Sequence, residues 1–523
     1  MFYICSMTDL TILWFRRDLR IHDHAALAAA CASAGPVLPL YIFEPERLAG
    51  PDVSGRQFDF LTESLGDLDS ALRKLGSSLC LRTGEAVDVL SRLHLRHGVR
   101  AIYVHSETGS DAARLRDRKV RQWAIKAGIP FREVDNPGLV VRRPRPDDWD
   151  SLWDGGIRAP RFQAPERLAA HSVPSDDWPK AADFGIEADD CPGRQTGGRT
   201  AGVVRLRQFL SGGGRDYAKP NLPLLHQQSA SSALSPYLTY GALSVREVWQ
   251  GAMRARQACL EDGDSTFAAA LEAFAEGLRQ RCRLLQDAED LTGPDGRSSL
   301  KPDKAGRPDI ARGDTRLEAW LSGQTGFPII DAGMRCLRQT GQLDSRLRGL
   351  LFSFAACHLW MAPDAPAQQL ARLCTDFDPA VFHMNVRSQP GMADSPASWI
   401  PNPVRQSLAR DPDGDFIRKW VPEIAGLGAQ HIHAPWDAPK AELANAGIVL
   451  GQTYPMRMVD HAAASREARE RLAPLRPRPL ETLWARPPAA PRKTTAPKSA
   501  RGRKPVSRPP AQLSLDLGTP VQH

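Results

Sequence analysis

The sequence predicts two unlike domains: an N-terminal doubly wound α/β domain with a parallel sheet, followed by a larger all-α domain. Three observations support this. Short apolar runs alternate with helix-length amphipathic segments over roughly the first 140 residues, which is typical of a parallel sheet covered by helices. Beyond residue 201 the strand-like runs fade, and helical periodicity continues to about residue 472. A chain of 523 residues is also long enough for two or three substantial cores.

Each element of the first domain follows from a local pattern. The apolar run TDLTILWF at 8–15 predicts a strand buried on both faces. Further strands are expected at 37–43, 79–82 and 100–104, and helices near 24–34, 57–75, 86–97 and 110–127.

The domain boundaries are set by changes in composition. We expect an α/β domain over 8–135, an interdomain connector over 136–200, a helical domain over 201–472 and a tail over 473–523. The connector contains the breaker phrases PRPDDW, WDGGIRAP and CPGRQTGGRT. The tail is rich in Pro, Ala, Lys and Arg, a composition that predicts disorder.

The net charge of +8 is concentrated in the tail. Residues 486–510 carry eight basic side chains and no acid, so subtracting them leaves the rest of the chain about neutral. The nine cysteines form no CxxC pair, which argues against structural zinc and iron–sulfur clusters and suits a reducing cytoplasm. We expect no bound metal, no membrane span and no signal peptide, with Met1 or Met7 as the start.

The stretch from 346 to 424 carries the strongest chemical pattern. The apolar segment RLRGLLFSFAACHLWM begins with Arg346 and Arg348, and CTDFDPAVFH then supplies Asp376 and Asp378. A charge beside so much apolar surface is costly unless it is paired. An Arg–Asp pair with a second acid nearby suits a planar ligand with hydrogen-bonding edges.

This stretch, with the N-terminal phrase WFRRDLRIHDHAAL at 14–27, resembles the photolyase/cryptochrome family. The later phrases PNPVRQ, FIRKWVPE, HAPW and YPMRMVDH strengthen the resemblance, which covers 8 to about 472. It implies a Rossmann-like N-terminal domain and a C-terminal helical FAD-binding domain that holds FAD folded into a U shape.

The resemblance also implies cofactor-binding positions. Tyr217 matches an aromatic at the adenosine end, and the phrase SSALSPYLTYG matches the family's phosphate-binding segment. Arg281 falls where the family faces the pyrophosphate, Arg348 and Asp376 match an ion pair beside the flavin ring, and Asp378 matches an acid near its pyrimidine edge. The phosphate-binding positions are Ser231, Ser232, Leu234 and Ser235, with Ala233 at a place that is usually polar or basic.

Several positions depart from the family pattern. Gly277 and Gln280 stand where dimer-repairing relatives have Glu and Trp against the lesion, and Gln342 replaces a substrate-facing residue. Ser345 occupies the place of the His on which (6-4) repair depends. Catalytic residues are therefore left unassigned, and His358 and His383 are more simply read as packed side chains.

The usual electron path and the second chromophore are also unsettled. Ile310, Pro363 and Val386 stand at the places of the three conducting tryptophans, and Trp360 is either an alternative donor or core packing. Phe382 aligns with the position that faces flavin N5, with Asn385 close by. The resemblance implies an antenna chromophore, a folate or a deazaflavin, and Glu107 either binds it or is a solvated turn residue.

The tail offers two partners. Residues 486–510 either bind DNA phosphates non-specifically or form a solvated linker. The peptide Gln512–Leu517, QLSLDL, resembles the short motif with which bacterial DNA-processing proteins bind the sliding clamp.

Three functions stay open on these residues. The leading one is a photolyase-type lyase, in which reduced FAD absorbs blue light and donates an electron that splits a pyrimidine dimer flipped out of damaged DNA. The alternatives are a cryptochrome-like photoreceptor without repair activity and a flavoprotein whose light chemistry has been lost. We expect a monomer.

Overall fold

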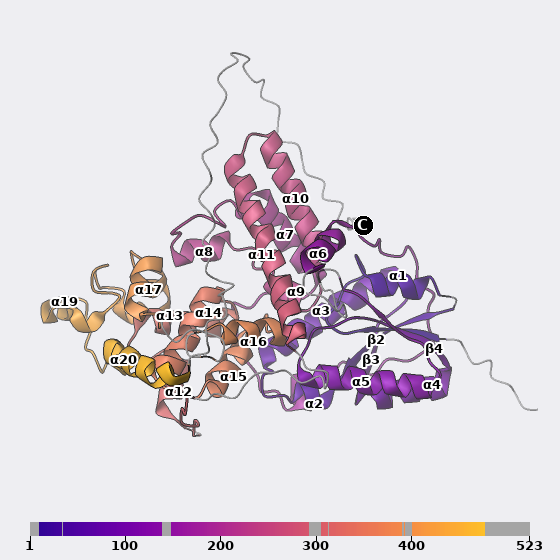
Figure 1. Ribbon diagram of the computed structural model, residues 1–523, viewed down its shortest axis with the longest axis horizontal. Helices are drawn as coiled ribbons and strands as arrows, with labels where there is room; N and C mark the ends of the chain where they lie inside the picture. Colours follow the sequence, from indigo (N-terminus) through magenta and orange to yellow (C-terminus); the bar gives the residue numbers. More distant parts are fainter. Residues whose placement is uncertain are drawn as a thin grey trace, which may run out of the picture.

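The computed structural model describes residues 10–475, except 34, 137, 139–147, 292–304, 312, 390–391 and 393–399. It shows an α/β domain at one side of the molecule and helices over the rest (Figure 1). The expected fold class is confirmed. The basic segment 486–510 and the peptide Gln512–Leu517 lie outside the described residues, so the expectations placed on them remain predictions.

The sheet of the first domain is parallel and has the strand order β3-β2-β1-β4-β5. Its strands are β1 (Leu10–Phe15), β2 (Val37–Phe43), β3 (Cys80–Thr83), β4 (Val99–His105) and β5 (Phe131–Val134). All six residues of β1 are buried, as its unbroken apolar run predicts. Strand β5 was not expected from the sequence, because it is a short, half-buried edge strand with Arg132 and Glu133 at its centre.

Helices cover both faces of this sheet. They are α1 (Ala25–Cys31), α2 (Pro45–Leu48), α3 (Gly55–Lys74), α4 (Ala86–His97) and α5 (Asp111–Lys126). Side chains of β1 alternate between two cores: Leu13 and Phe15 pack with α1 and α3, whereas Ile12 and Trp14 pack with α4 and α5. Figure 1 shows α4 and α5 on the face opposite α1.

The segment expected as a connector contains α6 (Trp149–Arg158). Trp149, Trp153 and Ile157 are buried in a core shared with α10 and α11, so this part of the segment belongs to the helical body. The stack of Trp149 on Trp153, with ring centroids 6.0 Å apart, adds to that packing.

The helical domain is built around two cores. The first includes α7 (Arg199–Gln208), α9 (Ser235–Thr239), α10 (Val245–Glu261) and α11 (Ser265–Asp290), with α8 (Leu224–Ala230) packed on the second. The second also contains α12 (Thr315–Ser322), α13 (Pro328–Thr340), α14 (Ser345–Ser353), α15 (Asp364–Leu373), α18 (Asp415–Trp420) and α20 (His461–Leu472). Around it lie α16 (Pro379–Arg387) and α19 (Lys440–Asn445), and α17 (Pro403–Arg410) contacts α13.

Buried polar contacts lock the two domains together. Leu19 donates its amide N–H to the carbonyl of Tyr240, and Arg20 donates to the carbonyl of Gly241, over 3.1 and 3.0 Å. Asp23 and Arg246 form a buried ion pair of 3.1 Å. Because these groups would be left unpaired if the domains separated, the contacts oppose separation. No described helix is both long and apolar enough to cross a membrane.

Candidate functional site

A pocket enclosing about 620 Å³, including its open mouth, lies among α9, α11, α14 and α16. It brings together five of the residues predicted from the sequence: Ser235, Arg281, Arg348, Asp376 and Asp378. They come from segments up to 143 positions apart in the chain. A shared cavity explains why the charges of Arg348 and Asp376 border apolar sequence.

The ion pair of Arg348 and Asp376 forms one wall of this pocket. Both terminal nitrogens of the guanidinium bind the carboxylate, over 2.9 and 3.0 Å, in the two-pronged geometry that arginine favours. The Arg348 Nε donates to the carbonyl of Leu343 over 2.8 Å, and the Ser235 hydroxyl donates to Asp376 over 2.5 Å. Both charges are thereby held in fixed orientations.

The electrostatics of the pair favour its charged form. Burial alone would raise the pKa of Asp376, but the adjacent Arg348 guanidinium outweighs burial and holds that pKa below its usual range. Burial would correspondingly lower the pKa of Arg348, and the charge of Asp376 reverses that effect and raises it. Removing either partner would leave an uncompensated buried charge.

Asp378 occupies the start of α16 and the edge of the pocket. Its carboxylate accepts hydrogen bonds from the backbone N–H groups of Ala380 and Val381, at 3.1 and 3.4 Å, and so caps the helix. Arg281 approaches the same carboxylate from α11, with 3.2 Å between Nη2 and Oδ2. The cap and the ion pair together fix where α16 enters the site.

The remaining wall of the pocket is largely apolar. Phe352, Leu370, Phe377, Phe382 and Val386 line it, with Phe377 and Phe382 in an edge-on contact at 5.3 Å. A flat aromatic ligand could pack on this wall while its polar edge faces the charged side chains opposite. Such a combination of apolar walls and few polar groups is typical of cofactor sites.

The other predicted cofactor residues do not line this pocket. Tyr217 packs against Phe209 and Phe274, with ring centroids 5.7 and 5.5 Å away. Leu234 is buried in the core, and the hydroxyls of Ser231 and Ser232 accept local backbone N–H groups. Their assignments remain predictions.

Thr239, Phe352 and Gln389 are among the pocket residues that were missed from the sequence. Thr239 could have been found, because it follows Ser235 by four residues and therefore shares its helix face. Phe352 lies four residues after Arg348 on α14 in the same way. For Gln389 the flanking sequence offered no comparable signal.

The positions that depart from the family pattern are spread around the site. Ser345 is exposed and lines the pocket, whereas Gln280 is exposed on α11 and does not line it. Phe382 and Asn385 both line the pocket from α16, so an amide is present beside the aromatic ring. His358 is buried, contacts the Ser465 hydroxyl at 3.0 Å, and has its pKa lowered by burial to about 4.

Trp360 lies outside the pocket lining and is flanked by cations. The guanidinium carbons of Arg307 and Arg471 each lie 4.9 Å from its ring centroid. Positive charges at this distance stabilise the neutral ring and disfavour its oxidation to a cation.

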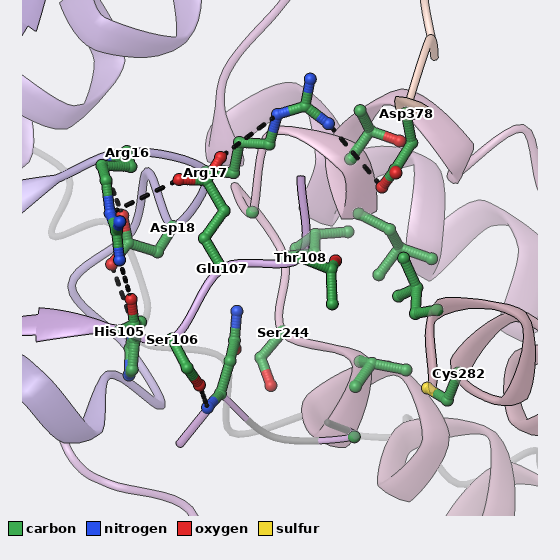
Figure 2. Close-up of a pocket in the computed structure, with 18 of the residues that line it drawn as sticks. Arg16, Arg17, Asp18, His105, Ser106, Glu107, Thr108, Ser244, Cys282 and Asp378 are labelled. Carbon is green, nitrogen blue, oxygen red and sulfur yellow. Dashed lines mark hydrogen bonds and ion pairs between the residues drawn. The ribbon is translucent and has the colours of Figure 1, made fainter. Parts of the chain in front are cut away.

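A second cavity of about 660 Å³ lies where the α/β domain meets the helices (Figure 2). It borders the carboxyl ends of β1 and β4, the point at which the strand order reverses, where open α/β sheets usually form clefts. Thr239, Arg281 and Asp378 line both cavities, so these side chains separate the two. Glu107 does not behave as a solvated turn residue, because Arg116 binds it at 3.0 Å.

Comparison with known proteins identifies the family. Residues 11–144 match the model of DNA photolyase, and 294–474 match the FAD binding domain of DNA photolyase. The chain is 31% identical over 489 residues to a deoxyribodipyrimidine photo-lyase of Agrobacterium fabrum, covering 88% of this chain and 97% of that protein. The chain belongs to the photolyase/cryptochrome family. The predicted family is thus confirmed.

Relatives within the photolyase/cryptochrome family include proteins named photolyases and proteins named cryptochromes. A cryptochrome DASH of Gloeobacter violaceus is 28% identical and covers 88% of this chain and 95% of its own. A bacterial class III photolyase structure from Agrobacterium tumefaciens has a TM-score of 0.76 at 29% identity, and the match covers 91% of this chain and 99% of that chain. An archaeal photolyase from Sulfolobus tokodaii, described with two FAD molecules, has a TM-score of 0.65 at 25% identity. That match covers 89% of this chain and 100% of that chain.

The residues of the pocket fit the FAD that this family domain binds. The charged wall offers both donors and acceptors to the polar edge of the isoalloxazine, and the aromatic wall offers a surface for its rings. The second core encloses α14, and α16 packs against it, so the pocket walls are rigid.

Proposed function

We propose that this protein is a light-driven DNA repair enzyme that splits pyrimidine dimers, and that FAD binds with its flavin end in the 620 Å³ pocket. The observation that carries the proposal is the Arg348–Asp376 pair, facing an aromatic wall in a cavity whose lining includes the exposed Ser345. A ligand bound deep in this pocket would be reached from outside past Ser345. Reduced FAD supplies the excited electron that the repair reaction uses.

The protein's own residues would hold and orient both reactants. Asp376 and Asp378 would accept hydrogen bonds from the flavin edge, while Arg348 and Arg281 offset their charges. Asn385 and Gln389 line the same cavity and would offer amide groups to a flipped-out base. Ser345 is too short to replace a histidine proton donor, so a cyclobutane dimer is the substrate we favour over a (6-4) product.

The test is a repair assay with defined DNA. The protein is purified with its flavin chemically reduced, mixed with an oligonucleotide carrying one cyclobutane dimer, and illuminated with blue light. Dimer loss that requires light and reduced flavin supports the proposal, with a dark sample and Asp376→Asn protein as controls.

The alternative is a cryptochrome-like photoreceptor, favoured by the replacement of lesion-contacting side chains at Gly277 and Gln280. Bound, reduced flavin without dimer loss would support this alternative, provided that light still changes the redox state of the flavin. A variant that restores the aromatic, Gln280→Trp, then asks whether stacking alone is missing, since base–aromatic stacking contributes about 1–3 kcal/mol per base.

A second chromophore would have to bind outside the pocket that FAD occupies. A hollow of about 780 Å³ lies across α16 from that pocket, lined by Ala112, Leu291, Pro379, His383 and Met384 among others. We propose it as the site for a folate or a deazaflavin, because Leu291 and Met384 offer apolar surface to a flat ring and Arg114 and Arg387 offer cations to an acidic chain. Acid extraction of the purified protein followed by absorption spectroscopy would identify the compound, and Ala112→Trp should reduce its yield without reducing that of FAD.

A further inference from the structure

We propose that Arg17 is a positioning residue that connects the flavin-pocket carboxylate Asp378 to the charged cluster of the α/β domain. Arg17 follows the end of β1 by two residues, and its side chain extends between two carboxylates from different domains (Figure 2). Its Nε lies 3.7 Å from Glu107 Oε1, and its Nη1 lies 3.8 Å from Asp378 Oδ2. The inference rests on the proposed flavin site.

Glu107, Arg17 and Asp378 together form a charge bridge between the two domains. The Glu107 end of this bridge is fixed. Its side chain is only 10% exposed, and Arg116 and Arg16 bind Oε2 at 3.0 and 3.5 Å. Burial would raise the pKa of Glu107, but Arg116 and Arg16 outweigh burial and hold that pKa below its usual range. The surrounding cations therefore favour the charged form of Glu107, which attracts Arg17.

The Asp378 end is shared with the helical domain. Arg281 pairs with the same oxygen, Oδ2, so one carboxylate receives one cation from each domain. The Arg17 Nη1 is buried and makes no hydrogen bond among the residues that the structure describes, and its effect on Asp378 is therefore one of charge alone. In a largely buried setting, an effect of charge extends over such distances with less screening than in water.

The bridge completes a row of alternating charges across the domain boundary. The row consists of Arg47, Glu44, Arg116, Glu107, Arg17, Asp378 and Arg281. Since Asp378 caps α16, and α16 supplies Phe382 and Asn385 to the pocket, the α/β domain helps to fix one pocket wall.

This arrangement has a consequence for the charge of the pocket. Reduction of bound flavin adds negative charge to a cavity that already holds Asp376 and Asp378. Arg17 does not line this pocket, so its positive charge offsets part of that negative charge from outside the cavity. Loss of Arg17 should make the flavin harder to reduce, and loss of Glu107 should make it easier.

The test measures the midpoint potential of the bound FAD by redox titration in full-length protein. Arg17→Gln should shift the potential to more negative values, and Glu107→Gln should shift it to more positive values. Arg17→Lys, which keeps the charge, should lie near the unaltered protein. Matched controls are Lys119→Gln and Glu46→Gln, which make the same charge changes at exposed positions and should leave the potential unchanged.

The outcomes separate this inference from the flavin site itself. If the unaltered protein binds FAD and neither Arg17→Gln nor Glu107→Gln moves the potential beyond its control, the bridge is only structural and the inference is wrong. Loss of FAD from Arg17→Gln at an unchanged melting temperature, with retention in Arg17→Lys, would support it. Failure of Asp376→Asn to affect FAD would instead overturn the proposed flavin site.

Discussion

The α-carbon of Gly241 lies directly against the main chain of Arg17, so a Cβ at position 241 would overlap the Arg17 carbonyl oxygen. Gly241 also has a φ of +66°, which L side chains rarely adopt. This close approach allows the neighbouring hydrogen bonds between Leu19 and Tyr240 and between Arg20 and Gly241. The domain boundary is thus shaped by backbone contact as much as by charge.

Substitution Gly241→Ala should therefore destabilise the protein strongly. We expect Gly241→Ala to lower the melting temperature by much more than Gly263→Ala, the matched control, lowers it. Gly263 has a φ of +80° but open space around its Cβ direction, so it isolates the backbone strain of about 1 kcal/mol. Equal effects of the two substitutions would show that the Gly241 contact relaxes freely.

Substitution Asp376→Asn should remove most of the FAD from purified protein. The change leaves Arg348 buried without its counter-charge, and breaking one partner of a buried pair costs about 3–5 kcal/mol. The absorbance ratio of flavin to protein measures occupancy, and we expect a loss of at least tenfold in affinity. Asp364→Asn, on the exposed start of α15, is the control and should keep full occupancy. A fully loaded Asp376→Asn protein would contradict the assignment.

Stability should fall as the pH falls below 6.5, in part through His105. This ring contacts Asp18 at 2.9 Å, and burial lowers its pKa to about 3, against about 6.5 in an unfolded chain. Between these values the unfolded state binds the extra proton, so each unit of acidification costs about 1.4 kcal/mol, whereas above 6.5 the group has no effect.

Unfolding experiments at pH 6.5 and 5.0 would check the role of His105. His105→Gln should weaken the pH dependence, whereas His226→Gln, at an exposed position, should not. An unchanged slope in His105→Gln would mean that the buried ring does not stay neutral.

Trp360 should be dispensable for light-driven flavin reduction. Arg307 and Arg471 both lie against its ring and oppose a positive charge there. Trp360→Phe should keep the photoreduction rate within about twofold while lowering the melting temperature, because cation–π contacts of about 0.5–1 kcal/mol are weakened. Trp178→Phe, at an exposed position, is the control for both readouts. A tenfold loss of rate in the Trp360 variant would instead make it an electron donor.

Removal of residues 476–523 should weaken non-specific DNA binding in a salt-dependent way. The deleted segment includes the eight basic residues of 486–510, and each phosphate contact contributes about 0.9 to the slope of log affinity against log salt. Filter binding with undamaged DNA from 50 to 200 mM salt, about the range over which this effect is large, would measure it. An unchanged slope would identify the segment as a solvated linker.

The clamp expectation has its own test. Leu515→Ala combined with Leu517→Ala should abolish binding to an immobilised bacterial sliding clamp, while Ser514→Ala, within the same peptide, should not. Equal binding by both variants would show that the resemblance of QLSLDL is accidental.

The sequence predicted the fold well where patterns were long and uniform. The unbroken apolar run of β1 and the alternating helices identified the doubly wound sheet. Strand β5 was missed because four residues with two charges carry too little periodicity, and its pairing with β4 comes from tertiary contact. Helix α6 was missed because Pro-rich phrases surround it, although its buried face is regular.

The site was predictable where charge interrupts apolar sequence, as at Arg348 and Asp376. Arg17 gave no such signal, because a polar turn after a strand accounts for WFRRDLR equally well. Its role depends on Glu107 and Asp378, which lie 90 and 361 positions away and meet it only in the folded chain.

The three residues that follow β1 with their side chains in different directions also limit what the chain can tolerate. Arg16 binds Asp117, Arg17 reaches Glu107 and Asp378, and Asp18 contacts His105. Inserting or deleting one residue after Phe15 would shift each of these side chains into the orientation of its neighbour. All three contacts would then be lost together. The length of this turn is therefore under tighter constraint than the identity of any single residue within it.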